Sequence, residues 1–329
     1  MRENFTSIAK EKRMLKNIII GLTLLLLCAV MAQAVVDSMS YGDNTIEWKV
    51  YDTEGPASAF AVSNKQLWYS TGQTVGLIDR KTNKKRAYPR LGDAPSSGVT
   101  TIALDNSGGV WFGGNSGVTL LKNKKFEHFT KSNGLSDDVV NKIEYLSGAV
   151  WIATGNGISR YSSGSWNTYT TDQGVCGNNV RDITADNKGN IYFATDKGIA
   201  VFTGSSWKKY DMSNGLSAND VKAVAYDTRK GVLWAAVGEQ DVNNLEGKEW
   251  NTFMDIRPDI TSIMADTQSR IWFGSTSGML KYNGFEWVAD PAKIGFPAAV
   301  ISQMYRDSKG DLYFAIETGV LHMKNPYPF

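Results

Sequence analysis

The sequence has few of the residues that build metal sites or disulfide networks. Its 329 residues include only two histidines, two cysteines and eight prolines. So few histidines and cysteines cannot form a His-rich or Cys-rich zinc site, and they leave histidine-based catalysis few options. We therefore expect no metal and no cofactor, and we expect packing alone to stabilise the fold.

The sequence also lacks an excess of charge of either sign. Lys and Arg number 35 and Asp and Glu 33, which gives a formal net charge of +2. A nucleic-acid groove needs a strongly basic surface, so the charge indicates no nucleic-acid partner. With 42% hydrophobic and 21% charged residues, the composition is that of an ordinary globular protein. The chain is long enough to bury a large core in one large domain or two smaller ones.

The one long apolar segment lies near the N-terminus. Basic residues between positions 10 and 16 precede an apolar run from Ile18 to Met31, and Ala32-Gln33-Ala34 follows as a small-x-small cleavage site. The run is shorter than the roughly 20 residues of a spanning helix, so residues 1–34 are predicted to be a signal peptide cleaved after Ala34. The mature protein would then be periplasmic or secreted, with no membrane span. An uncleaved anchor and a lipid anchor at Cys28 are the alternatives.

A repeat of about 40 residues fills the rest of the chain. Within a copy, four short strands are separated by Gly-bearing turns of hairpin length, which is typical of an antiparallel meander. Meanders of this length, repeated four to eight times, are the blades of a β-propeller. We predict an all-β fold, a seven-bladed β-propeller over residues 35–329, with almost no helix. The copies align on one aromatic residue in each second strand: Trp68, Trp111, Trp151, Tyr192, Trp234, Trp272 and Tyr313.

A motif in the fourth strands predicts how the ring closes. Trp-x-x-Tyr/Phe recurs there, for example at Trp166 and Trp207, but the seventh copy ends before any such strand. The missing motif is Trp48-Lys-Val-Tyr51, ahead of the first complete copy. We therefore expect a strand at about residues 45–52 to complete the last blade. The ten tryptophans then occupy two repeat positions, and we expect them to pack between blades.

Several copies resemble the two-component regulator propeller repeat. The resemblance rests on segments such as Gly215-Leu-Ser with Leu233-Trp234, and Val150-Trp-Ile-Ala-Thr-Gly155, and it extends over about residues 41–329. It implies a sensor-type propeller, exported to the periplasm or cell surface, that binds a ligand or a partner. Members of that family usually carry two propellers ahead of a membrane span, a histidine kinase and a receiver. None of these follows the seventh copy, so we expect a stand-alone binding module.

The candidate binding residues lie in loops at one face of the predicted ring. The loops that lead into the first strands and the loops between second and third strands should share this face with the mouth of the central channel, and function concentrates in such loops. The alternative is that Asp and Asn side chains there only cap turns. The candidates are Asp137, Asp138, Asn141, Asn178, Asn179, Arg181, Asp182, Asn219, Asp220, Lys222, Asp259 and Thr261.

These residues predict a mixed-charge mouth that binds a polar ligand, either a carbohydrate or a peptide, or a protein partner in the cell envelope. The alternative is a scaffold subunit of a secretion or envelope complex, since similar repeats occur in the type IX secretion apparatus, and a membrane-bound sensor is a further candidate partner. A lyase or hydrolase using loop carboxylates is the minority interpretation. The streptogramin lyases are propellers with a histidine base, but His128 and His322 are not expected near the loop face.

Three other features have simpler interpretations. The Asp-x-x-Gly segments that start at Asp105, Asp186 and Asp307 lack the further ligands of a calcium loop and predict hairpin turns. Cys176 stands where other copies have the Ser of Gly-Leu-Ser, which indicates a passive replacement. Residues 237–244 lack the Gly-x-Gly form of the equivalent loops, which makes them a candidate specificity element.

Overall fold

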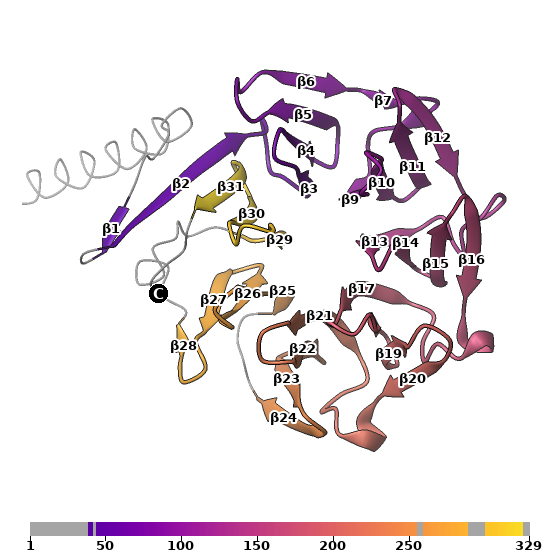
Figure 1. Ribbon diagram of the computed structural model, residues 1–329, viewed down its shortest axis with the longest axis vertical. Coiled ribbons are helices and arrows are strands. Elements are labelled where there is room, and N and C mark those ends of the chain that lie inside the picture. Colours follow the sequence, from indigo (N-terminus) through magenta and orange to yellow (C-terminus); the bar gives the residue numbers. More distant parts are fainter. Residues whose placement is uncertain (1–38, 42–43, 255–258, 289–299, 325–329) are drawn as a thin grey trace, which may run out of the picture.

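The computed structural model describes residues 39–41, 44–254, 259–288 and 300–324. Seven sheets stand around a central axis, and the strands β3, β9, β13, β17, β21, β25 and β29 lie nearest to that axis (Figure 1). The predicted seven-bladed β-propeller is confirmed. The expected signal peptide, residues 1–34, lies outside the described residues. No helix among the described residues is long and apolar enough to cross a membrane.

Six blades are antiparallel meanders of four strands taken in sequence order. Blades 1 to 3 are β3 (Ala59–Val62), β4 (Gln66–Ser70), β5 (Val75–Asp79) and β6 (Lys85–Tyr88); β9 (Val99–Leu104), β10 (Val110–Gly114), β11 (Gly117–Lys122) and β12 (Lys125–Phe129); and β13 (Val140–Leu146), β14 (Ala149–Thr154), β15 (Gly157–Ser162) and β16 (Ser165–Tyr169). Blades 4 to 6 are β17 (Val180–Ala185), β18 (Ile191–Thr195), β19 (Gly198–Phe202) and β20 (Trp207–Tyr210); β21 (Val221–Asp227), β22 (Val232–Val237), β23 (Asp241–Glu246) and β24 (Glu249–Phe253); and β25 (Ile260–Ala265), β26 (Ile271–Ser275), β27 (Gly278–Tyr282) and β28 (Trp287–Val288).

The connections between blades contain little regular structure. A two-stranded ribbon, β7 (Arg90–Leu91) and β8 (Ala94–Pro95), follows blade 1. Single 3-10 turns, η1 (Thr171–Gln173) and η2 (Met212–Asn214), precede blades 4 and 5. Each of these turns has an N-cap side chain, Thr170 or Asp211, and ends at a glycine with positive φ. The expectation of almost no helix is therefore confirmed for the described residues.

Burial decreases from the second strand of a blade to its fourth. Every residue of β14 is buried, because both faces of this strand are covered by neighbouring blades, whereas β16 is exposed or half-buried throughout. Trp111 of β10 shows the packing between blades, since its ring centroid lies 5.1 Å from that of Tyr161 and 6.4 Å from that of Trp166, both in blade 3. The tryptophans therefore pack between blades as predicted, although Trp166, Trp207, Trp250 and Trp287 of the fourth strands are only half-buried.

The last blade combines the two ends of the described chain. Its strands β29 (Gln303–Arg306), β30 (Leu312–Ile316) and β31 (Gly319–Lys324) are completed by β2 (Asn44–Asp52), which pairs antiparallel with β31 from Glu47 opposite Lys324 to Asp52 opposite Gly319 (Figure 1). The expected closing strand is therefore confirmed, within one residue of its predicted start. A short strand, β1 (Met39–Tyr41), pairs with the first three residues of β2, beyond the end of β31.

A cluster of polar and aromatic side chains joins the closing strand to blades 1 and 7. The guanidinium of Arg80, in blade 1, donates to the hydroxyl of Tyr51 at 3.2 Å and to that of Tyr313 at 2.7 Å. The ring of His322 stacks on Tyr313 with centroids 4.4 Å apart, and its Nε2 lies 2.9 Å from Asp311 Oδ2. Burial lowers the pKa of His322 from its usual 6.5, although Asp311 partly opposes this shift. The ring closure therefore includes a histidine that favours its neutral form.

We expect acid to weaken this closure. Because the pKa of His322 is lower in the folded state, the unfolded chain binds more protons. The contribution to stability is complete above the unfolded-state pKa of 6.5 and is lost as the pH falls through the folded-state pKa. His322→Leu introduces the residue found at the equivalent Leu77 and Leu120 and should remove this part of the pH dependence. Urea titrations of both proteins at several pH values test this: parallel curves of unfolding free energy against pH would contradict it.

The Asp-x-x-Gly segments form the expected hairpin turns. In the first of them, Asp105 Oδ1 accepts the backbone N–H groups of Ser107 and Gly109, each at 2.8 Å, and Oδ2 accepts the indole N–H of Trp111 at 2.8 Å. Equivalent bonds recur at Asp186, with a hydroxyl of Tyr192 in place of the indole. Each aspartate therefore links a turn to the aromatic residue of the next strand, which is buried at Trp111 and half-buried at Tyr192.

Candidate functional site

The inner strands are joined by a ring of hydrogen bonds close to the loop face. An apolar residue lies at the start of each inner strand or two residues before it, and in five blades the pairing register shifts near the residue after it. The side chain of this second residue reaches the carbonyl of the apolar residue of the next blade. Six such bonds occur in the described chain, of 2.7–3.4 Å: Ser58 to Val99, Thr100 to Val140, Asn141 to Val180, Arg181 to Val221, Thr261 to Ile301 and Ser302 to Ala57.

Four candidate residues occupy this repeat position. Asn141, Arg181 and Thr261 donate to the next blade and therefore contribute to ring closure. Lys222 is the seventh member, and its ammonium instead lies 3.6 Å from Asp259 Oδ1. All four residues line the cavity at the mouth of the channel, and their predicted binding role stays a prediction. Their contacts with the next blade were not predicted.

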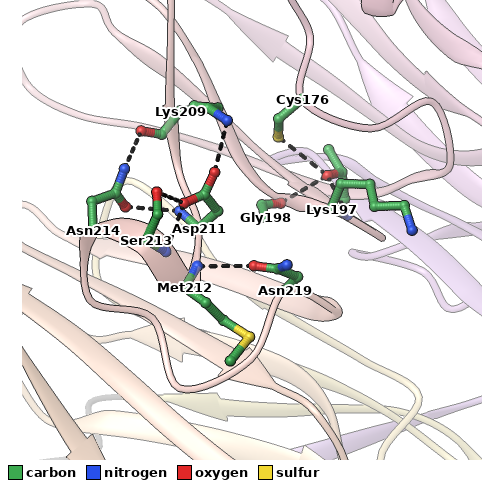
Figure 2. Close-up of polar contacts among 10 residues, drawn as sticks. Cys176, Lys197, Gly198, Lys209, Asp211, Met212, Ser213, Asn214 and Asn219 are labelled. Carbon is green, nitrogen blue, oxygen red and sulfur yellow. Dashed lines mark hydrogen bonds and ion pairs between the residues drawn. The ribbon is translucent and has the colours of Figure 1, made fainter.

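Three other candidates hold the loops in shape. Asn219 Oδ1 accepts the backbone N–H of Met212 at 2.8 Å, seven residues earlier, which fixes the loop that leads into blade 5 (Figure 2). Asn178 accepts from Thr171 at 2.9 Å and Asp138 from Lys131 at 2.6 Å, over the same separation. In these three bonds the Asn and Asp side chains cap turns, which is the alternative to ligand binding given in the sequence analysis. The predicted binding role of these side chains stays a prediction.

The first residue of the Gly-Leu-Ser loop is glycine for two reasons, its positive φ and its close approach to a tryptophan. At Gly215 the backbone has a φ of +116°, and a Cβ there would lie 2.8 Å from Trp250 of the same blade. Gly134 is placed in the same way against Trp166, and Gly174 against Trp207. In these three blades the glycine of the loop therefore packs closely against the tryptophan of the fourth strand, and this contact holds the loop against its blade.

The remaining loop candidates make fewer contacts. Asp137 Oδ1 accepts the N–H of Val139 at 2.9 Å, a local turn, and Asn179 contributes its backbone carbonyl to Asp196 at 3.2 Å. The sulfur of Cys176 lies 3.3 Å from the hydroxyl of Thr195 (Figure 2), and burial raises the pKa of this thiol. In blade 3, Ser136 makes the equivalent contact with Thr154 at 2.9 Å. These contacts support the interpretation of Cys176 as a replacement for serine.

One expected loop is shorter than predicted. Residues 237–244 were expected to form a distinctive loop at the loop face, but Asp241–Glu246 is strand β23 and pairs with β22 up to Val237. Only residues 238–240 connect the two strands. The pattern was misleading because Val242 and Asn243 are buried strand residues, and the amide of Asn243 bonds to Ser217 and Thr252 inside the blade.

Two ion pairs lie at the mouth of the channel. Arg181 Nη1 is 2.5 Å from Asp220 Oδ1, and Lys222 lies near Asp259 as described above. In both pairs, the base comes from an inner strand and the acid from the loop that leads into the next blade. Asp220 and Asp259 are thus each paired with a base and not with each other. No three His, Cys, Asp or Glu side chains of the described chain are arranged to hold a metal ion.

Three charged side chains lie close together in the channel below the mouth. It forms a cavity of about 320 Å³ lined by the inner strands. Lys142 Nζ lies 3.2 Å from Glu144 Oε1 and 4.0 Å from Asp182 Oδ1, so one ammonium group serves two carboxylates. Burial raises the pKa of Glu144 and of Asp182, with Lys142 opposing the shift in both. Burial also acts against the charge of Lys142, but the two carboxylates outweigh it and raise its pKa.

Of this triad, only Asp182 was among the candidates from the sequence. Lys142 and Glu144 were not among them, and both lie within strand β13. A signal for them exists in the repeat. The residues equivalent to Glu144 in the other blades are all uncharged: Ala61, Ala103, Thr184, Ala225, Met264 and Tyr305.

A second hollow, of about 680 Å³, lies between the outer parts of blades 2 and 3. Its walls are hairpin turns and the aromatic side chains of Trp111, Tyr145 and Tyr161. The charged groups in its wall include Asp105, which is saturated by its turn, and Lys122, which donates to Ser107 at 2.9 Å. Opposite charges do not converge there as they do in the channel.

Comparisons with known proteins define the class of fold. No protein-family model and no curated protein matches the chain. Among solved structures, the chain is similar to the extracellular domain of a hybrid two-component system from B. thetaiotaomicron, with a TM-score of 0.68 and 17% identity over 86% of this chain and 42% of that one. The chain therefore spans less than half the length of that domain.

Two other solved propellers are similar over almost their whole length. One is a catalytically inactive virginiamycin B lyase from Staphylococcus aureus with quinupristin, with a TM-score of 0.66 and 17% identity over 84% of this chain and 98% of that one. The other is YCF48 bound to D1 peptide, with a TM-score of 0.63 and 13% identity over 87% of this chain and 98% of that one. At such identities these likenesses show the fold alone.

Proposed function

We propose that this protein is an exported, non-enzymatic binding propeller that recognises a polar ligand, a carbohydrate or a peptide, or a protein partner in the envelope at the mouth of its channel. The observation that supports this most is the convergence of the Arg181–Asp220 and Lys222–Asp259 pairs at one opening. Both pairs are partly exposed, with side-chain exposures of 30–60%, so a ligand can contact them without displacing the core. Ligands orient on a few polar groups of this kind in a preformed cavity.

The character of the neighbouring folds also supports binding. The similar structures include an extracellular sensor domain and a propeller bound to a peptide. A lyase is among them as well, with quinupristin. In this chain, however, both histidines are held in strands: His128 bonds to Thr119 at 2.9 Å in β12, and His322 belongs to the ring closure. Neither lines the channel cavity.

A ligand screen with matched variants tests the proposal. The purified protein is applied to a glycan array and a peptide library, next to the variant Asp220→Ala/Asp259→Ala and the control Glu249→Ala, which removes an exposed carboxylate from the outer strand β24. We expect ligands that bind the parent and the control but bind the double variant at least tenfold more weakly, because each substitution leaves a base at the mouth without its acid.

The outcomes separate the alternatives. Ligands that bind all three proteins equally would show that the mouth does not recognise them. Binding that Glu249→Ala alone reduces would place recognition on the outer strands, as expected for a scaffold subunit.

A further inference from the structure

We propose that the channel binds a primary ammonium group of its ligand beside Glu144 and Asp182. This inference rests on the proposed function and names the chemistry that the site recognises. The group could belong to a lysine side chain or free amino terminus of a peptide, or to an amino sugar. In each case the contact would be the same, an ammonium group that donates hydrogen bonds to two carboxylates.

Within the triad, two carboxylates share one base. Lys142 is the one base within 4.0 Å of Glu144 and Asp182 in the described chain, and it lies closer to Glu144. The side chains of Lys142 and Asp182 are only 22% and 17% exposed. Partly buried carboxylates that share one base gain from a second cation. The upward pKa shifts of both carboxyl groups have the same cause, since burial disfavours their charge.

The fold does not require these charges. The repeat supplies a comparison, because the position of Lys142 and Asp182 is occupied in the other five blades by uncharged residues: Ala59, Thr101, Ala223, Ser262 and Gln303. At Glu144 the six equivalents are uncharged as well. Since buried charges cost stability and neutral residues satisfy the same positions elsewhere, charge confined to blades 3 and 4 indicates a role other than folding.

Lys142 also lacks a bond that three other blades make at this position. A side-chain oxygen there accepts a backbone N–H of the next blade's inner strand: Thr101 accepts from Ile143 at 3.1 Å, Gln303 from Phe60 at 2.8 Å and Asp182 from Val224 at 3.0 Å. An ammonium group has no acceptor, so blade 3 cannot make this bond. Lys142 therefore serves the two carboxylates at the expense of a contact between blades.

The surroundings favour an ammonium group over a metal ion. Lys142 would repel a divalent cation about twice as strongly as an ammonium group. A divalent cation also takes six or more oxygen ligands, whereas an ammonium group needs three acceptors. Tyr305 and Gln303 also line the cavity, although the amide of Gln303 is bonded to the backbone of Phe60. Arg306 lines it too, but in the repeat it corresponds to Tyr145, one residue farther from the loop face than Glu144.

Paired probes test the proposal by calorimetry. They are Nα-acetyl-lysine amide with Nα-acetyl-norleucine amide, glycylglycine amide with its N-acetyl form, and glucosamine with N-acetylglucosamine. We expect at least one free amine to bind in the millimolar range or tighter and its uncharged partner not to bind. The amine that binds most tightly identifies the source of the ammonium group.

Variants locate the binding. Glu144→Gln and Asp182→Asn should each weaken amine binding at least tenfold, whereas Thr184→Val, which changes the channel wall at the position equivalent to Glu144, should not. The triple variant Lys142→Thr/Glu144→Ala/Asp182→Thr carries residues that other blades use and should fold but bind no amine. Its thermal melt keeps the test decisive if a single variant is unstable.

Several results would overturn the inference. These are equal binding of amines and their uncharged partners, no binding of any amine, and undiminished amine binding by the triple variant. If no amine binds while screened ligands still depend on Asp220 and Asp259, the proposed function stands and only this inference fails.

Discussion

A chain that begins after β2 is expected to lose its cooperative unfolding transition. Deleting residues 1–52 removes Trp48 and Tyr51, which are 8% and 5% exposed, and uncovers the whole edge of β31. Truncating one buried tryptophan typically costs about 3–5 kcal/mol, and a domain has about 5–15 kcal/mol in total. Losing both aromatic residues with their backbone pairing should therefore exceed the stability of the ring.

The matched control is a deletion of residues 1–43. It removes β1 but keeps β2, and β1 pairs only with the first three residues of β2. We expect this control to melt cooperatively, within a few degrees of the full chain. Differential scanning calorimetry and near-ultraviolet circular dichroism compare the two deletions. If the chain without residues 1–52 melts cooperatively near the temperature of the control, the remaining strands and the neighbouring blades hold the ring without β2.

Asp266→Asn is expected to be among the most destabilising single substitutions. Asp266 is 1% exposed, and its Oδ2 accepts from Arg270 Nε at 2.6 Å and from Trp272 Nε1 at 3.0 Å. The substitution keeps the shape of the side chain but removes the charge that balances a guanidinium only 5% exposed. Breaking a buried ion pair in this way costs about 3–5 kcal/mol, because a buried cation loses a neighbouring carboxylate.

Asp307→Asn is the control for this prediction. Asp307 caps the equivalent turn in blade 7, accepting from the backbone of Lys309 and Asp311, and its other oxygen accepts from the neutral hydroxyl of Tyr313 at 3.3 Å. We expect a loss of about 1 kcal/mol, as for an ordinary hydrogen bond. Unfolding free energies from urea titrations compare the two variants. Equal losses would show that the turn, and not the buried charge, determines the cost at Asp266.

The architecture could be predicted from the sequence because the same strand pattern recurs in seven copies. The spacing of residues such as Trp151 and Trp234 fixed the blades, and the displaced motif at Trp48 predicted the closing strand. These features depend on burial patterns that recur along the chain. Averaging over copies makes them readable even where single copies deviate, as in blade 5.

The site was only partly predictable, because its geometry depends on contacts between blades. The sequence brought Arg181, Lys222 and Asp220 to one face but could not show that each base is paired with an acid of the next loop. Whether a strand residue faces the channel depends on the register shift near the start of the inner strand. Without that shift, Lys142 and Glu144 read as ordinary polar strand residues.

Because β2 pairs with β31, the chain could be circularly permuted without changing the order of strands around the ring. Lys324 lies opposite Glu47, so a short turn could join the end of β31 to the start of β2 and turn them into an ordinary hairpin. New termini could then be placed between β2 and β3. Every blade of such a circular permutant would be a continuous segment, and the ring would be held shut only by contacts between neighbouring blades. Comparing the unfolding rate of the permutant with that of the unpermuted protein would measure how much the blade built from both ends of the chain slows unfolding.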